Sequence, residues 1–265
     1  QTRGWFYTLH AISTFAFDSV AYKNVVSNGL VLDKNGQKMS KRLGNGIDPF
    51  DTLEKFGADP TRWYMITNAQ PWDNLKFDLE GINEVKRKFF GTLHNTYSFF
   101  CLYANLDDFD FNSSFIDVAL RPEIDRWIIS KLNTLIVNVD ECYSNYEPTK
   151  AGRLIQEFTV DDLSNWYVRL CRKRFWKGEV NDDKLAAYQT LYTCLKTIAL
   201  LSSPIAPFYS DLLYNDLIKS ADNDKASVHL ADFPIINKSE IDLLLERASI
   251  ALDKTFAYVK LHGLM

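Results

Sequence analysis

The sequence predicts a mainly α-helical protein with a smaller mixed α/β part at its N-terminal end. Apolar residues recur at spacings of three and four through most of the chain after residue 78. A β-branched strand pattern lies before residue 33, and the 265 residues include only 11 Gly and 8 Pro. At this length we expect two compact units, residues 1–70 and residues 71–265.

The first part begins with a helical pattern and continues into a strand and a loop. Residues 5–15 carry apolar side chains at helical spacing, and residues 25–32 read as a short strand interrupted at Asn28-Gly29. Residues 33–36 are a turn signal. Residues 37–47 show no apolar period, so we predict a loop there.

Two short helices are predicted to follow the loop. Asp48 and Asp59 each precede a proline, which is the pattern of an N-cap before proline at the first helical position. Gly57 can close the first of these helices.

From residue 78 onward the pattern is helix after helix. One buried stripe per helix is expected, and in the second helix it comprises Ile124, Trp127, Ile128, the stem of Lys131, Leu135, Ile136 and Val139. The predicted ranges are 78–105, 122–145, 148–177, 182–202, 205–219 and 240–262. Residues 105–121 and 220–237 are the long connections, and an antiparallel bundle is the simplest arrangement.

Composition excludes several classes of protein. Hydrophobic residues make up 46% of the chain, which excludes a disordered segment, and the net charge of −4 argues against indiscriminate binding to polyanions. The cysteine spacing fits neither a disulfide framework nor a zinc site, so we expect no structural metal and a reducing, cytoplasmic location. The apolar runs are too short for a membrane span.

Positive charge is concentrated near the start of the chain. Residues 1–45 carry six Lys or Arg against two acids, and three of the cations fall within Lys38-Met39-Ser40-Lys41-Arg42. Gly44 and Gly46 are candidate pivots. We call residues 37–47 the basic loop. Such a loop can fold over a triphosphate and stabilise the charge that develops on departing pyrophosphate, at roughly 3 kcal/mol per well-placed donor. The alternative for an isolated basic pentad is solvated surface.

The neighbouring residues favour the phosphate interpretation. The KMSKR pentad follows a strand that begins Asn28-Gly29, is preceded by residues 1–6 (QTRGWF), and is followed by Gly57-Ala58-Asp59 and Arg62. This combination resembles the second signature of the class I aminoacyl-tRNA synthetases, and specifically the isoleucyl-tRNA synthetase family. Valyl-type and leucyl-type relatives differ in the opening hexad.

The resemblance implies roles for individual residues. Lys41 would bind ATP, with Lys38 as its catalytic partner on the triphosphate. Trp5 would form a wall of the pocket for the isoleucine side chain, although periodicity alone also fits a core aromatic. The other implied ATP contacts are Ser40, the main chain around Gly29 and Val31, and Gln1 beside the ribose.

A second basic cluster lies on the helix predicted at 148–177. Residues 165–177 contain five cations and no acid. Guanidinium groups suit phosphate, and an exposed indole can stack on an unpaired base. The segment resembles the anticodon-binding bundle of the same family. The residues predicted to contact tRNA are Arg169, Arg172, Lys173, Trp176 and Lys177, although cations at a helix end also complement its dipole.

The resemblance implies the activity of the parent enzyme. That enzyme would form isoleucyl-adenylate from L-isoleucine and ATP with Mg²⁺, and transfer the acyl group to tRNA(Ile); a monomer is expected. The H-x-G-H signature and any editing insertion are not in these residues, so we expect an inactive fragment. The alternatives are a valyl-type or leucyl-type relative, an RNA-binding helical module without catalysis, and a helical interaction protein.

Overall fold

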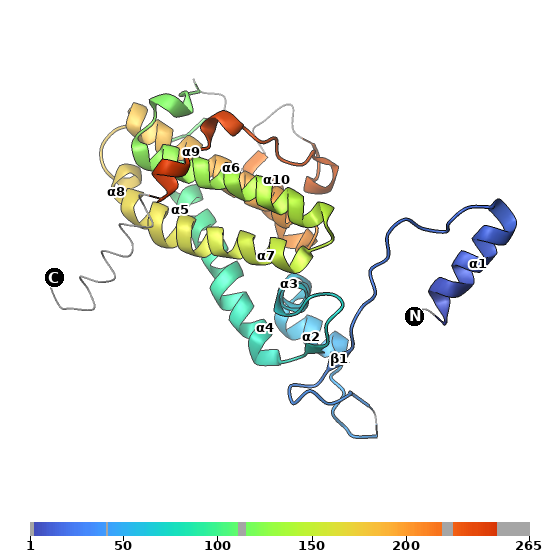
Figure 1. Ribbon diagram of the computed structural model, residues 1–265. Helices are drawn as coiled ribbons and strands as arrows, with labels where there is room; N and C mark the ends of the chain where they lie inside the picture. Colours follow the sequence, from blue (N-terminus) through green and yellow to red (C-terminus); the bar gives the residue numbers. More distant parts are fainter. Residues whose placement is uncertain (1–2, 41, 111–114, 219–224, 248–265) are drawn as a thin grey trace.

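The computed structural model describes residues 3–40, 42–110, 115–218 and 225–247. Over these residues the fold is mainly helical. Figure 1 shows a body of packed helices, a short strand pair near its base, and the helix α1 standing apart at the end of an extended segment. The predicted fold class is confirmed.

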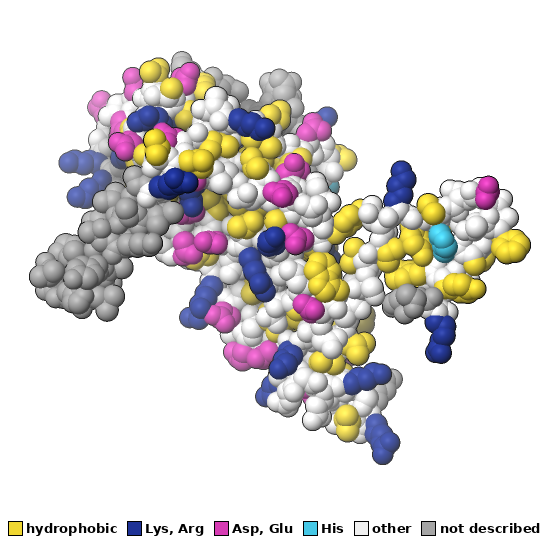
Figure 2. Space-filling model, in the orientation of Figure 1, with side chains coloured by type: hydrophobic (Ala, Val, Ile, Leu, Met, Phe, Trp, Pro, Cys, Tyr) yellow, Lys and Arg dark blue, Asp and Glu magenta, His cyan; other side chains and the backbone are white. Residues whose placement is uncertain are grey.

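Helix α1 (Trp5–Phe17) confirms the first predicted helix. It ends at Asp18, whose φ of 46° is left-handed, and none of its residues is buried. The Tyr22 hydroxyl donates a hydrogen bond to the Phe6 carbonyl oxygen at 2.9 Å, which fastens the helix to the segment that follows. Figure 2 shows hydrophobic side chains gathered on this outlying part of the molecule.

The two strands form a minimal parallel sheet. Strand β1 (Val31–Leu32) pairs with β2 (Leu75–Lys76), with Val31 opposite Leu75. The sequence did not predict β2. The strand predicted over residues 25–32 is wrong for its first six residues. The reason is that the partner strand is only two residues long. Before β1 begins, the Gly29 N–H donates to the carbonyl oxygen of Pro71, which lies outside β2.

Helices α2 (Pro49–Phe56) and α3 (Ala58–Asn68) confirm the predicted pair. The Asp48 carboxylate caps α2 by accepting a hydrogen bond from the Phe50 N–H at 2.7 Å. Gly57 closes α2 at a φ of 90°, a conformation that favours glycine.

The predicted cap at Asp59 is wrong. Gly57 precedes the first residue of α3, and Asp59 lies within its first turn, buried. The Asp59 Oδ2 accepts a hydrogen bond from the Tyr209 N–H at 2.5 Å, at the start of a distant helix. The Arg62 Nε donates to the Ile205 carbonyl oxygen at 2.9 Å in the same region. Both side chains therefore join α3 to the helical body rather than shape α3 itself.

The helix predicted at 78–105 is one continuous helical stretch with a wide turn in it. It comprises α4 (Leu79–Val85), the π-helical segment η1 (Lys86–Phe90) and α5 (Gly91–Leu106). The connection that follows contains a 3₁₀ turn, η2 (Val118–Leu120).

The bundle continues with long helices near their predicted bounds. Helix α6 (Glu123–Ser144) is followed by α7 (Pro148–Glu157), the π-helical η3 (Phe158–Val168) and α8 (Arg169–Trp176), which together form the helix predicted at 148–177. Helices α9 (Asp182–Ser202) and α10 (Pro207–Ile218) complete the bundle of helices seen in Figure 1.

The C-terminal part is described only in short pieces. Two 3₁₀ turns lie here: η4 (Val228–Leu230) packs against α10, and η5 (Lys238–Glu240) packs against α6. Residues 243–247 begin the helix predicted at 240–262, and the rest of that range lies outside the described residues.

One large core holds the bundle together. It takes in the predicted stripe of α6, of which Ile124 and Lys131 are only partly buried, and the fully buried rings of Trp63, Tyr167 and Tyr188. A smaller cluster beneath it is built from Phe56, Tyr64, Leu75, Phe77 and Ile82. Across the described parts of the chain, no helix combines the length and apolar character that crossing a membrane requires.

Candidate nucleotide-binding loop and nucleic-acid interface

The base of the basic loop is a tight hairpin centred on Asp33. The Asp33 N–H donates to the Gln37 carbonyl oxygen at 2.9 Å, and Leu32 and Lys38 form an antiparallel bridge. The Asp33 Oδ1 accepts hydrogen bonds from the N–H groups of Asn35 and Gln37, at 3.0 and 2.8 Å. This confirms the predicted turn and fixes the chain at the point where β1 ends.

Asn45 connects the far end of the basic loop to this base. Its Nδ2 donates to the Asp33 Oδ2 at 2.9 Å and to the Lys38 carbonyl oxygen at 3.3 Å, while its Oδ1 accepts from the Ser40 N–H at 2.9 Å. The hydrogen bond from Asn45 is the leading cause that lowers the pKa of Asp33, followed by that from the Gln37 main chain. Sequence reasoning missed Asn45.

The described residues of the KMSKR pentad face solvent to different degrees. The Lys38 side chain is exposed, and Ser40 is half-buried with its Oγ accepting from the Leu43 N–H at 3.2 Å. Met39 packs against the smaller core cluster, as an apolar anchor should. Lys41, and Gln1 with its predicted ribose contact, lie outside the described residues.

Gly29 and Val31 lie where β1 begins. A Cβ on Gly29 would come within 1.9 Å of the Asp73 carbonyl oxygen, so only glycine fits this close approach of two main chains. The Leu30 and Leu32 carbonyl oxygens accept from β2, at 2.9 Å from the Leu75 N–H and 2.8 Å from the Phe77 N–H. Successive residues of a strand direct their main-chain N–H and C=O groups to opposite edges. The groups of Val31 therefore face the edge of β1 that lies away from β2. The Leu32–Lys38 bridge of the hairpin lies on that edge, and the predicted contact of adenine with the main chain around Gly29 and Val31 stays a prediction.

A cavity of about 420 Å³ lies between the base of the basic loop and residues 77–80. Asp33, Asp78 and Glu80 contribute carboxylates to its lining, with Lys34 as the one cation there. Within the described parts of the chain, no group of three or more His, Cys, Asp or Glu residues is arranged to hold a metal ion.

Trp5 is not brought together with the basic loop. It lies on α1 with 70% of its surface exposed, and α1 stands clear of the loop in Figure 1. The prediction that Trp5 lines an isoleucine pocket therefore draws no support from the packing of these residues and stays a prediction.

The second basic cluster forms one face of α8. Arg169, Arg172, Lys173 and Trp176 follow one another at helical spacing and are all exposed, and Lys177 continues the face at the end of the helix. We call these five residues the basic helix face. The opposite side of α8 is buried through Cys171 and Phe175. All five residues predicted to contact tRNA are therefore exposed, and the contact itself stays a prediction.

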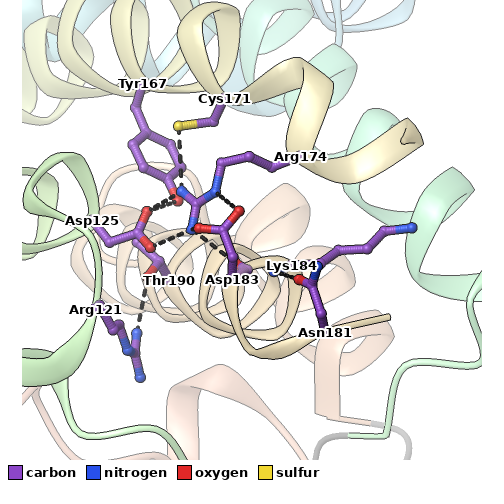
Figure 3. A network of polar contacts seen from close by, with 9 residues as sticks. All are labelled: Arg121, Asp125, Tyr167, Cys171, Arg174, Asn181, Asp183, Lys184 and Thr190. Atoms are coloured by element: carbon purple, nitrogen blue, oxygen red, sulfur yellow. Dashed lines mark hydrogen bonds and ion pairs between the residues drawn. The ribbon is translucent and has the colours of Figure 1, made fainter. Parts of the chain in front are cut away.

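Arg174 is the exception in this segment, because its guanidinium points into the bundle (Figure 3). It donates to both carboxylate oxygens of Asp125 on α6, and its Nε and Nη2 reach Asp183 on α9 at 3.0 and 2.8 Å. The Tyr167 hydroxyl also donates to Asp125, at 2.7 Å. Burial raises the pKa of Tyr167, and the nearby Asp125 charge adds to this rise, so the hydroxyl stays a donor.

The buried network decides how the basic helix face is presented. A fully buried Asp125 on the apolar stripe of α6 needs a cationic partner, and Arg174 supplies it from the far side of α8. Residues three and four apart share a helix face, whereas residues two apart point to nearly opposite sides. Because Arg174 is fixed inward, Arg172 and Trp176, each two positions away, point outward. The network was not predicted, although an acid inside an apolar stripe was a visible signal for it.

Comparisons with known proteins match both parts of the chain. Residues 125–260 match the family described as the anticodon-binding domain of tRNA ligase, and residues 1–78 match the tRNA synthetases of class I (I, L, M and V).

Named relatives agree with these matches. The chain is 66% identical over 257 residues to an isoleucine--tRNA ligase of Bacteroides thetaiotaomicron, covering 96% of this chain and 22% of that protein. It is 67% identical to one from Cytophaga hutchinsonii (95% and 23% covered) and 49% identical to one from Dehalococcoides mccartyi (93% and 24% covered). The chain spans about a fifth of the length of these curated relatives.

Two solved structures share the fold. The LeuRS of Agrobacterium radiobacter, in a ternary complex with tRNA and LeuAMS, gives a TM-score of 0.67 at 19% identity and covers 89% of this chain and 27% of that one. The Mycobacterium tuberculosis methionyl-tRNA synthetase in complex with methionyl-adenylate gives 0.57 at 22% identity, with 74% and 38% covered.

Proposed function

Because this chain belongs to the family of tRNA ligases that carry this anticodon-binding domain, we propose that its full-length protein is an isoleucine--tRNA ligase. In this reaction the carboxylate of L-isoleucine attacks the α-phosphorus of ATP, and the bond to the departing pyrophosphate breaks. The isoleucyl group is then transferred from the adenylate to a terminal ribose hydroxyl of tRNA(Ile). The observation that carries the proposal is a KMSKR pentad that begins at Lys38 on the hairpin after β1, in a chain 66% identical to a ligase of this name.

The basic loop supplies the charge that activation needs. Negative charge grows on the pyrophosphate as it leaves, and ammonium groups held beside it stabilise that state more than the ground state. Lys38 is exposed on the hairpin, and Lys41 is the second cation of the pentad. Mg²⁺ would enter with ATP and neutralise phosphate oxygens.

The helical bundle supplies the contact with RNA. The basic helix face combines four cations with an exposed indole, a combination that suits phosphate and an unstacked base. We further propose a boundary near residue 70 between the activating part and this tRNA-binding part, and a monomeric, cytoplasmic enzyme.

ATP–pyrophosphate exchange in the full-length protein tests this proposal. Exchange should depend on isoleucine and should fall by roughly 10²- to 10³-fold in Lys38→Ala and in Lys41→Ala, with little change in the KM for isoleucine. Lys34→Ala removes an exposed lysine from the turn beside the loop and should leave exchange near the wild-type rate. Exchange driven by valine or leucine instead, or no exchange with any amino acid, would refute the assignment.

A further inference from the structure

The far end of the basic loop is tied to its near end by one amide side chain. Asn45 makes hydrogen bonds to three separate points of the loop, namely the Asp33 carboxylate, the Lys38 carbonyl oxygen and the Ser40 N–H. Its donor and acceptor atoms are therefore both in use.

The near end of the loop is itself rigid. Asp33 is 9% exposed and directly follows Leu32, whose carbonyl oxygen accepts from the Phe77 N–H at 2.8 Å in the strand pair. The Asp33 carboxylate already accepts two main-chain hydrogen bonds within the hairpin. Asn45 is thus anchored to a fixed point. Its contact with Asp33 joins two residues that are 12 positions apart and so closes the loop between them.

This arrangement fixes the main chain on both sides of Met39. Lys38 is held by its bridge to Leu32 and by the hydrogen bond from Asn45, and Ser40 is held through its N–H. The Lys38 ammonium therefore retains only the freedom of its own side chain. A charge that must meet a developing negative charge gains from such preorganisation, since a displacement of about 1 Å can cost 10²-fold in rate.

We propose that Asn45 is a positioning residue for adenylate formation, which holds the Lys38 main chain through its contacts with Asp33 and Ser40. The inference rests on the proposed function, because it assumes that Lys38 meets the triphosphate. It adds a residue outside the pentad to the activating machinery and assigns Asp33 as the anchor on which Asn45 acts.

The test uses ATP–pyrophosphate exchange in the full-length enzyme. Asn45→Ala should lower kcat by about 10- to 100-fold while the KM for isoleucine changes less than about twofold. Asn45→Asp should be impaired at least as much, because its carboxylate would face that of Asp33. Asn35→Ala is the matched control, since it removes an exposed asparagine side chain from the same hairpin and leaves its main-chain N–H in place.

A charge swap separates positioning from general damage to the loop. In Asp33→Asn with Asn45→Asp, the new amide can donate to the new carboxylate, which can still accept from the Ser40 N–H. The hydrogen bond to the Lys38 carbonyl oxygen is missing, and a carboxylate oxygen now faces that carbonyl oxygen, so kcat should recover only in part, to a value between those of Asn45→Ala and the wild type. Amide exchange at Ser40, measured on this chain, should be faster in Asn45→Ala and restored in the swap.

The outcomes distinguish this inference from the proposed function. If wild-type protein exchanges pyrophosphate with isoleucine but Asn45→Ala does so at the same kcat, or if the swap restores Ser40 protection without raising kcat above that of Asn45→Ala, the positioning role is wrong and the function stands. If the wild type shows no isoleucine-dependent exchange, the proposed function itself has failed.

Discussion

Asp125 and Arg174 form a two-pronged ion pair inside the bundle, with Oδ1 to Nη1 and Oδ2 to Nη2 distances of 2.7 Å each. Asp125 is fully buried on α6, and Arg174 comes from α8, the helix whose other cations face solvent (Figure 3). A pair of this geometry fixes both the distance and the rotation of α8 relative to α6.

Breaking this pair should destabilise the chain strongly. Asp125→Ala leaves a buried guanidinium without its main partner, and we expect a loss of about 3 kcal/mol in the free energy of unfolding, measured by urea denaturation. Asp125→Ala combined with Arg174→Leu should cost less than Asp125→Ala alone, because neither charge of the pair remains. Arg172→Ala, at an exposed position on the same helix, should stay within about 0.5 kcal/mol of the wild type. Equal stability of Asp125→Ala and Arg172→Ala would contradict the role of the pair.

The junction between α3 and α10 should make stability depend on pH. Burial raises the pKa of Asp59 above its ordinary 3.8, although the hydrogen bond from the Tyr209 main chain acts in the opposite direction. A raised pKa in the folded state means that folding favours the protonated acid. The contribution of Asp59 to stability is therefore greatest below the pKa of the unfolded chain and declines as pH rises through the folded pKa.

Asp59→Asn isolates this effect from the other titrating groups. The difference in unfolding free energy between the wild type and Asp59→Asn, measured in urea from about pH 4 to 7, should move in favour of Asp59→Asn as pH rises. Asp59→Ala should be less stable than Asp59→Asn by about 1 to 3 kcal/mol, because the Tyr209 N–H loses its acceptor. A difference between the wild type and Asp59→Asn that does not vary with pH would show that the pKa of Asp59 is not raised.

The sequence predicted the helices well because their signals are local. The stripe of α6 and the exposed face of α8 follow from a period of 3.6 residues, and Asp48 and Gly57 mark the ends of α2 by their own chemistry. These features need no partner from elsewhere in the chain.

Features that depend on distant residues were missed or misassigned. Strand β2 is two residues long and exists only because β1 lies beside it. Asp59 carries the local pattern of a cap, but its carboxylate finds the Tyr209 N–H, 150 residues away. The contact between Asn45 and Asp33 was likewise invisible, since it depends on the path of the loop rather than on any periodicity.

The basic helix face should dominate the salt dependence of tRNA binding. Each phosphate contact contributes roughly 0.7 to 0.9 to the slope of log affinity against log salt concentration. Replacing Arg169, Arg172 and Lys173 with Ala should therefore reduce the magnitude of that slope by roughly 2 to 3. The variant should also bind tRNA more weakly, as measured by fluorescence anisotropy of labelled tRNA. The matched control replaces three exposed lysines on other elements, Lys55, Lys225 and Lys238. If both triple variants change the slope equally, the binding is diffuse and the basic helix face is not its site.

Trp5 offers a way to separate a ligand contact from a structural one. Because its side chain is 70% exposed on α1, Trp5→Ala should change the unfolding free energy of this chain by less than about 0.5 kcal/mol. In the full-length enzyme the same change should raise the KM for isoleucine by about tenfold, which corresponds to losing the apolar contact of a branched side chain, and leave the KM for ATP nearly unchanged. Phe15→Ala removes another exposed ring from α1 and should leave the KM for isoleucine unaltered. A Trp5→Ala enzyme with weakened ATP binding and normal isoleucine binding would show that the indole does not line the amino-acid pocket.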